Sequence, residues 1–294
     1  MRTSSRRLPA TSTFIPTALY GVVGWPLGQT LSPLLHNTAF QALGLPAVYL
    51  RWPIPPGGLP GFLESVRLLD IRGASVTIPH KIALLSLLDE VTEQAGLTGA
   101  VNTIYHDGAK VCGENTDVTG FLAPLADIDA PNADALLLGS GGAAHAAAAG
   151  LTLRRFRRVF IATPSDKNHL EPARRFSCTP VLWRERHDVP VDIVVNATPL
   201  GMCGAHENET PLDFKKFARP REGSARPLTV YDMVYNPLET RFLREARLAG
   251  HNCISGLSMF LGQGAAQFRI WTGEELPPAA FEALRTRLNA VGKI

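Results

Sequence analysis

The feature that most constrains the fold is a glycine-rich turn between a strand pattern and a helix pattern, in the segment ALLLGSGGAAHAAAAGL. Gly139, Gly141 and Ala144 occupy the three positions of the pattern G-x-G-x-x-G/A, and Gly142 adds another small residue. Small residues let the backbone approach a pyrophosphate, whose charge is met by the N–H groups and the dipole of the following helix. A plain strand-to-helix turn is the alternative reading. The strand before the turn and the helix after it favour a Rossmann-type dinucleotide site.

Apolar runs that alternate with helical patterns predict an α/β fold with a largely parallel sheet. In the first half, strands are expected in ALYGVVG, AVYLRW and GASVTI, and NTIYHDGAKVCGEN predicts a hairpin that turns at Asp107-Gly108. In the second half, strands are expected in DALLLGSGG, RVFIAT, DIVVNAT and TVYDMVY. A long helix is expected from about residue 259, and a terminal helix after the Pro-Pro pair.

The chain is long enough for two domains, because 294 residues with 45% apolar content can bury two cores. We expect residues 17–119 together with 262–294 to form an α/β substrate domain with a mixed sheet. Residues 120–261 are expected to form the Rossmann-type nucleotide-binding domain, with a hinge near Gly120. Residues 1–16 are rich in Ser, Thr and Arg and predict a disordered tail.

Charge and hydropathy exclude several classes of partner. The net charge is +3, and no long basic run occurs, so nucleic acid is not an expected partner. The sequence contains no apolar stretch of about 18 residues or more that would predict a membrane span. The cytoplasm is the expected location. The eight histidines and four cysteines have no ligand-like spacing, so no metal is expected.

A lysine in the segment GASVTIPHKIALLSLLDEV stands where a cation is unusual. Pro79 predicts the start of a helix, which places Lys81 in the first helical turn. The positive end of the helix dipole disfavours an ammonium group there, so Lys81 needs a carboxylate or a use for its mobile proton. Asp117, in ENTDVTG, is the expected carboxylate. The sequence therefore predicts a proton donor at Lys81.

Other polar residues stand near expected helix starts and strand ends. Thr30 and Ser32 precede Pro33 and a helix, where two hydroxyls can bind a carboxylate, although Ser32 as a simple N-cap is an equal alternative. VVNATPLGM and YDMVYNP, which contains Tyr235, end strands at the edge where a doubly wound sheet binds its ligand. Gln263 is expected on a helix that begins beside the same crevice.

These segments resemble the shikimate dehydrogenase family from about residue 19 to the C-terminus. The shared motifs, in the family's order, are hydroxyl-x-Ser-Pro, V-T-x-P-x-K, G-A-V-N-T, N-T-D, G-x-G-G, N-A-T-x-x-G-M, Y-D-x-x-Y and G-L-x-M with a following Gln. The resemblance implies a substrate domain, an NADP domain and C-terminal helices that pack back onto the first domain. It implies the NADP-dependent interconversion of shikimate and 3-dehydroshikimate in the chorismate pathway, by a monomer or a homodimer.

The resemblance also assigns roles to individual residues. The catalytic pair is Lys81 and Asp117, and whether Lys81 donates a proton to the developing alkoxide or only stabilises its charge stays open. The residues around the substrate carboxylate are Thr30, Ser32 and Tyr235, and those around the ring hydroxyls are Thr77, Asn102, Asp117 and Gln263. The expected cofactor-binding residues are Gly139, Ser140, Gly141, Gly142, Ala143, Ala144, Thr163, Ser165, Lys167, Asn196, Thr198, Met202, Met233 and Gly256.

Departures from the family pattern leave two alternatives open. Thr30 replaces the usual serine and Gln29 a common histidine, which can shift the preference toward quinate. Pro164 replaces the arginine that would bind the 2′-phosphate of NADP. Either Lys167, Thr163 and Ser165 bind that phosphate instead, or the protein uses NAD. A quinate/shikimate dehydrogenase using NAD or both cofactors is therefore the first alternative, and a non-catalytic regulator that binds the same acids is the second.

The arginines of residues 154–158 are not expected to contact the cofactor. They precede the second nucleotide-domain strand and so belong to the opposite edge of the sheet. We expect them to form a solvated helix end that complements the helix dipole.

Overall fold

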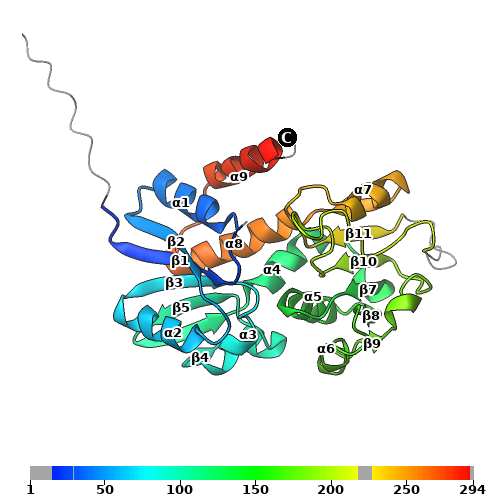
Figure 1. The fold of residues 1–294 in the computed structure, drawn as a ribbon, viewed down its shortest axis with the longest axis horizontal. Coiled ribbons are helices and arrows are strands. Elements are labelled where there is room, and N and C mark those ends of the chain that lie inside the picture. Colours follow the sequence, from blue (N-terminus) through cyan, green and yellow to red (C-terminus); the bar gives the residue numbers. More distant parts are fainter. Residues whose placement is uncertain (1–14, 29, 218–226, 292–294) are drawn as a thin grey trace, which may run out of the picture.

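The computed structural model describes residues 15–28, 30–217 and 227–291 and shows two sheets that lie side by side, flanked by helices (Figure 1). The α/β prediction is confirmed. Most of the predicted tail, residues 1–14, lies outside the described residues, as does Gln29.

The first sheet is mixed, with the strand order β2-β1-β3-β5-β6-β4. β1 pairs in parallel with β2 and β3, whereas β5 runs antiparallel to both β3 and β6. The predicted hairpin is β5-β6, and Gly108 in its turn has a φ of 58°, which glycine adopts without strain. The strands are β1 (Ala18–Gly24), β2 (Ala47–Pro53), β3 (Ile71–Val76), β4 (Glu90–Val91), β5 (Thr103–Asp107) and β6 (Lys110–Glu114). The helices beside this sheet are α1 (Ser32–Ala42), α2 (Leu59–Leu68) and α3 (Glu93–Thr98).

The second sheet is entirely parallel, with the strand order β12-β11-β10-β7-β8-β9. All residues of β7 are buried, as expected for a central strand covered on both faces. The chain order reverses between β7 and β10, and such a reversal is where an open α/β sheet forms its ligand crevice. The strands are β7 (Asp134–Leu138), β8 (Arg158–Ala162), β9 (Thr179–Pro180), β10 (Ile193–Asn196), β11 (Thr229–Asp232) and β12 (Asn252–Ile254). The helices are α5 (Gly142–Leu153), α6 (Leu170–Arg175) and α7 (Arg241–Leu248).

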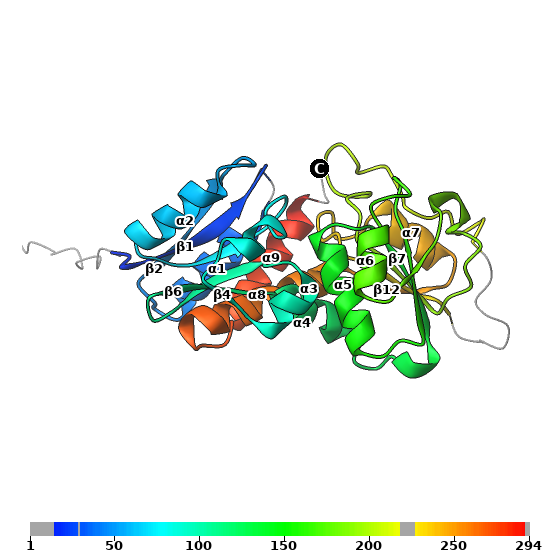
Figure 2. The same ribbon diagram turned by 90° about the horizontal axis from the view of Figure 1, so that it is seen from below.

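Two helices connect the sheets, α4 (Thr116–Leu122) and α8 (Gly256–Thr272). They pack against each other between the two halves (Figures 1 and 2). A Cβ at Gly120 would lie only 2.5 Å from the carbonyl oxygen of Met259, so glycine is required for this approach. α8 begins three residues before the expected position, because the Ser255 side chain caps it. Both expected domain boundaries lie inside these helices, and the domain division stays a prediction.

The C-terminal helix α9 (Pro278–Val291) packs against α1 of the first half (Figure 1). Its contacts with α1 and the position of α8 bring the end of the chain back to the first sheet. This arrangement agrees with the expected return of the C-terminal helices.

The helix predicted to begin at Pro79 is absent, and that prediction is wrong. Turns follow β3 and lead into a short 3-10 helix, Ala83–Ser86. The backbone is held by neighbouring segments, since Val101 N donates to Lys81 O at 2.8 Å. Leu84 is buried in the core of the first half, whereas Ile82 and Leu87 of the same apolar run are exposed, so the short 3-10 helix buries only part of the run. Lys81 therefore does not lie at the positive end of an α-helix.

The arginines after α5 lie at the sheet edge opposite the crevice, as predicted. They are more than a solvated helix end, however, because Arg157 and Arg158 both pair with the buried Asp134 at the start of β7. Burial raises the pKa of Asp134, but the hydrogen bonds and charges of the two arginines outweigh burial and hold that pKa below its usual value.

Candidate active site

A cavity of about 160 Å³ opens between the two halves, beyond the carboxyl end of β3. It is lined by all eight residues that the sequence assigned to catalysis or substrate binding: Thr30, Ser32, Thr77, Lys81, Asn102, Asp117, Tyr235 and Gln263. Three of the expected cofactor residues also line it: Ala143, Met233 and Gly256. The remaining lining residues are Val22, Ser75, Val76, Met259, Phe260 and Gln267. The fold thus gathers segments far apart in the sequence at one cavity.

Lys81 and Asp117 form an ion pair at this cavity, with Lys81 Nζ 2.5 Å from Asp117 Oδ2. Their side chains are only 14% and 6% exposed. Asp117 stands in the first turn of α4, where a carboxylate is favourable, and its N–H donates to the N-cap Asn115. The predicted pairing is therefore present, although Lys81 reaches it from a turn.

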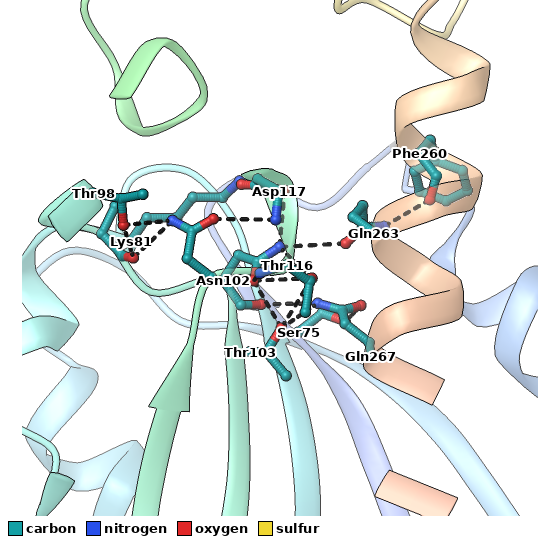
Figure 3. Close-up of polar contacts among 12 residues, drawn as sticks. Ser75, Lys81, Thr98, Asn102, Thr103, Thr116, Asp117, Phe260, Gln263 and Gln267 are labelled. Atoms are coloured by element: carbon teal, nitrogen blue, oxygen red, sulfur yellow. Dashed lines mark hydrogen bonds and ion pairs between the residues drawn. The ribbon is translucent and has the colours of Figure 1, made fainter. Parts of the chain in front are cut away.

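Asn102 connects Asp117 to the wall of the cavity (Figure 3). Asn102 Nδ2 donates to Asp117 Oδ1 at 2.8 Å and lies 3.4 Å from Gln263 Oε1. Gln263 Nε2 donates in turn to the carbonyl oxygen of Phe260, within α8. These hydrogen bonds orient the three side chains relative to one another at the cavity wall.

A group of hydroxyls, from Thr30, Ser32 and Tyr235, also lines the cavity. Thr30 Oγ1 donates to Ser32 Oγ at 3.3 Å, and the Tyr235 hydroxyl is hydrogen-bonded with Thr30 and with the backbone of Leu31. Burial raises the pKa of Tyr235, and these hydrogen bonds partly offset that rise. The N-cap alternative for Ser32 is wrong, because Leu31 is the cap residue and Ser32 is the first residue of α1.

The glycine turn passes directly beside Lys81. A Cβ at Gly142 would lie 3.1 Å from Lys81 Cδ. Gly139 has a φ of 123°, and a Cβ there would lie 2.7 Å from the carbonyl oxygen of Ala197. The turn therefore requires glycine at Gly139 for both conformation and space. Ser140 is half-buried, Gly141 is the N-cap of α5, and Ala144 is fully buried in that helix.

The predicted residues after β8 do not reach the cavity. Ser165 and Lys167 are exposed, whereas Thr163 is buried and lies 3.1 Å from His169 Nδ1. Ser165 Oγ accepts hydrogen bonds from the backbone N–H groups of Lys167 and Asn168. A hydroxyl and an ammonium group therefore project from the carboxyl end of β8, where a parallel nucleotide sheet holds the adenosine ribose.

Asn196 and Thr198, expected at the end of β10, form a buried network with Asp232 of β11 instead of lining the cavity, whereas Met233 after β11 does line it. Asn196 Nδ2 donates to Asp232 Oδ1 at 3.0 Å, and Thr198 Oγ1 donates to Asn196 Oδ1 at 2.7 Å. Burial raises the pKa of Asp232 to about 7, although hydrogen bonds from Thr240, Val234 N and Asn196 lower it. Met202 is 44% exposed. Asp232, the acidic residue of the Y-D-x-x-Y motif, had no predicted role and ties the segments after β10 and β11 together.

Two polar residues of the cavity wall were missed from the sequence, Ser75 and Gln267. Ser75 lies two residues before Thr77, and alternation along an extended segment puts such neighbours on one face. Gln267 lies one helical turn after Gln263 in α8 and therefore on the same face. This spacing was a usable signal in both cases.

None of the helices in the described parts of the chain is long and apolar enough to cross a membrane. Within residues 15–28, 30–217 and 227–291, no group of three or more His, Cys, Asp or Glu side chains is arranged to hold a metal ion.

The fold and the cavity define a two-domain α/β protein with a Rossmann-type sheet and a lysine–carboxylate pair beside its glycine turn, an arrangement typical of nicotinamide-dependent dehydrogenases. The family model for the shikimate dehydrogenase substrate binding domain matches residues 22–104, and that for the shikimate 5'-dehydrogenase C-terminal domain matches residues 256–284.

The chain is similar over nearly its whole length to several named proteins. The chain is 49% identical to "Shikimate dehydrogenase (NADP(+))" of Pelobacter propionicus, over 93% of this chain and 97% of that protein. It is 48% identical to the protein of the same name from Oleidesulfovibrio alaskensis, over 92% and 95% of the two chains. The crystal structure of shikimate 5-dehydrogenase from Thermus thermophilus in complex with NADP(H) and shikimate superimposes with a TM-score of 0.80, at 36% identity, over 92% of this chain and 99% of that one. The chain belongs to the shikimate dehydrogenase family, which confirms the predicted resemblance.

Proposed function

We propose that the chain catalyses the reversible, NADP-dependent reduction of 3-dehydroshikimate to shikimate, a step of the chorismate pathway toward aromatic amino acids. The Lys81–Asp117 pair carries this proposal, since it lies in a cavity lined by every residue expected for the substrate. The high identity to relatives named as NADP(+) enzymes supports it further. Both partners of the pair are present, which disfavours the non-catalytic regulator.

The substrate is proposed to lie with its carboxylate at Thr30, Ser32 and Tyr235, whose hydroxyl groups cluster at one side of the cavity. Its ring hydroxyls would then face Thr77, Asn102 and Gln263 on the other side. Neutral hydroxyl and amide donors orient a charged carboxylate by hydrogen bonds, without an additional cation.

The residues at the glycine turn fit a dinucleotide. A Cβ at Gly139 would clash with the carbonyl oxygen of Ala197, one at Gly142 would press on the Lys81 side chain, and the space beside Gly141 is open, so the backbone of the turn is accessible to a pyrophosphate. When bound, NADPH would supply a hydride to the ketone carbon of the substrate. The remaining predicted cofactor residues, from Thr163 to Gly256, are proposed to surround its ribose, phosphates and nicotinamide.

Lys81 is proposed to neutralise the oxygen that becomes negative as the ketone carbon accepts the hydride. A proton moves from Lys81 Nζ to that oxygen, and the substrate alcohol results. Asp117 Oδ2 holds the amine in place at 2.5 Å, and Asn102 holds the other carboxylate oxygen. In the oxidation direction the same amine takes the proton from the alcohol.

Lys167 and Ser165 are proposed to bind the 2′-phosphate of NADP in place of the missing arginine. Both are exposed at the carboxyl end of β8, and Ser165 organises the backbone N–H groups of the turn. An ammonium group and a hydroxyl supply charge and a hydrogen bond without the bidentate geometry of arginine.

Three further properties belong to this proposal: a division into residues 17–119 with 262–294 and residues 120–261, a cytoplasmic location, and a monomeric or homodimeric state. Analytical ultracentrifugation tests the last of these, and a larger assembly would contradict it.

Initial rates for shikimate and quinate, each with NADP and NAD, test the proposed function. We expect the highest kcat/KM for shikimate with NADP. A clear preference for quinate with NAD would establish the quinate/shikimate alternative. Binding of shikimate without any cofactor reduction would establish the regulator.

A further inference from the structure

A chain of buried hydrogen bonds runs along the wall of the cavity and ends at Asp117 (Figure 3). Its central members, Gln267 and Thr103, are 1% and 0% exposed. Neither has a role in the proposed function. Their orientations can be assigned from two backbone groups, whose donor or acceptor character is fixed.

The backbone carbonyl of Asn102 fixes the amide of Gln267. Gln267 Nε2 lies 3.0 Å from this oxygen, which can only accept, so the nitrogen of the amide must face it. Gln267 Oε1 consequently faces Ser75 Oγ at 2.7 Å and accepts its hydroxyl hydrogen. The Gln267 amide therefore has one possible orientation.

Gln267 in turn fixes the hydroxyl of Thr103. The second hydrogen of Gln267 Nε2 is donated to Thr103 Oγ1, also at 3.0 Å. With its oxygen accepting from Gln267, Thr103 directs its own hydrogen to Asn102 Oδ1 at 2.7 Å.

The backbone N–H of Thr116 confirms the orientation of Asn102 independently. This group can only donate, and it lies 2.8 Å from Asn102 Oδ1. Asn102 Nδ2 must then face Asp117 Oδ1, at 2.8 Å. Since Lys81 occupies the other carboxylate oxygen, both oxygens of Asp117 accept hydrogen bonds of fixed direction.

We propose that Thr103 and Gln267 are positioning residues, which hold the Asn102 amide in the one orientation that directs Asp117 and Lys81 toward the substrate. The direction of donation runs from Ser75 through Gln267, Thr103 and Asn102 to Asp117. This inference rests on the proposed role of the Lys81–Asp117 pair. Thr103 is not among the residues that line the cavity, so its effect on turnover passes through Asn102.

The test compares two variants of Thr103. Thr103→Val keeps the shape of the side chain and removes the hydroxyl, whereas Thr103→Ser keeps the hydroxyl and removes a methyl group. We expect Thr103→Val to lower kcat roughly 10-fold with little change in the KM for shikimate, because misplaced catalytic groups slow the chemical step more than binding. We expect Thr103→Ser to keep kcat within about 2-fold of the wild type, since the chain of donors is intact. Thermal unfolding of both variants accompanies the kinetics.

A double variant tests whether the residues act in series. Gln267→Met removes the amide at similar volume. In the Thr103→Val background it should lower kcat little further, because the first substitution has already interrupted the series of hydrogen bonds through which both residues act. If Thr103→Val does not fold, Gln267→Met alone carries the kcat measurement.

Three results would overturn the inference: wild-type kcat in a variant that has lost the hydroxyl or the amide, an equal loss in Thr103→Ser and Thr103→Val, or kcat losses that multiply in the double variant. The activity of the wild type shows whether the positioning role or the proposed function has failed. An inactive wild type contradicts the function, whereas an active wild type with an equally active Thr103→Val contradicts only the positioning role.

Discussion

The substrate half of the site comprises the residues proposed to bind the substrate, and the cofactor half comprises those proposed to bind NADP. The two halves differ in how many of their side chains are buried and hydrogen-bonded within the protein. In the substrate half, Asn102, Asp117 and Gln263 are hydrogen-bonded with one another around the cavity. In the cofactor half, Ser165, Lys167 and Met202 are exposed. Buried, mutually bonded groups hold their geometry, whereas exposed side chains act more independently.

This difference teaches where sequence changes are tolerated. A replacement in the substrate half leaves a buried partner without its hydrogen bond and so disturbs the chemistry. A replacement at the exposed end of β8 alters one contact with the cofactor. The departure at Pro164 is consistent with this, since it lies in the half where partners are easier to substitute.

Among the variants that test this difference between the two halves, Lys81→Ala should change activity most. We expect kcat to fall by about 10²-fold or more, with shikimate binding retained, because the variant loses the proton donor but keeps the hydroxyl cluster. Steady-state kinetics and calorimetric titration with shikimate measure the two quantities.

Lys81→Arg is the matched control, because arginine keeps the positive charge but does not give up a proton near neutral pH. It should remain as slow as the alanine variant if proton donation is the function of Lys81. An unchanged kcat in Lys81→Ala would remove this residue from the mechanism.

Asp232→Asn probes a buried network of the cofactor half. The folded-state pKa of Asp232 is raised to about 7, so the folded protein binds a proton that the unfolded chain releases at lower pH. Stability from this group is thus present at low pH and is lost as the pH rises through 7. Between pH 5 and pH 7 we expect a loss of about 2 kcal/mol in the free energy of unfolding of the wild type, relative to the variant.

Urea unfolding at several pH values measures this difference, and subtracting the two proteins cancels the titration of other groups. Asparagine can accept from Asn196 and Val234 N and donate to Thr240, so it mimics the protonated carboxyl. Parallel pH profiles for the two proteins would show that Asp232 does not titrate in this range.

Lys167→Ala should have the smallest effect. We expect the KM for NADP to rise about 10-fold while the KM for NAD stays unchanged, since only NADP carries the 2′-phosphate. Lys215→Ala, at another exposed lysine, is the control. Equal changes for both cofactors would mean that Lys167 does not contact the 2′-phosphate.

Much of the fold was predictable from local pattern. ALYGVVG corresponds to β1 and DALLL to β7, because apolar runs of this length bounded by polar or turn residues are typical of buried strands. The IALLSLLDEV segment was not predictable in this way. Its apolar spacing favours a helix, yet the segment forms only a short 3-10 helix, and the bond from Val101 N to Lys81 O ties its start to a segment that follows later in the chain.

Much of the site was also predictable, as much of the fold was. The eight residues that the motifs assigned to catalysis or substrate binding line one cavity, but no role was predicted for Ser75, Gln267 or Asp232. Gln267 meets Thr103 across a sequence separation of 164 residues. A contact of that kind depends on how α8 packs against the first sheet, which local pattern does not describe.

The sequence by itself determined the class of fold and the glycine turn, because each follows from residue type and short-range spacing, and its family motifs marked Lys81 and Asp117 as a catalytic pair. The tertiary structure alone decided which amide faces which carboxylate, which carboxyl group is buried without a cation, and from which side Lys81 enters the cavity. Those properties depend on the few ångströms between segments distant in the chain, and hydrogen bonding and desolvation vary steeply over such distances.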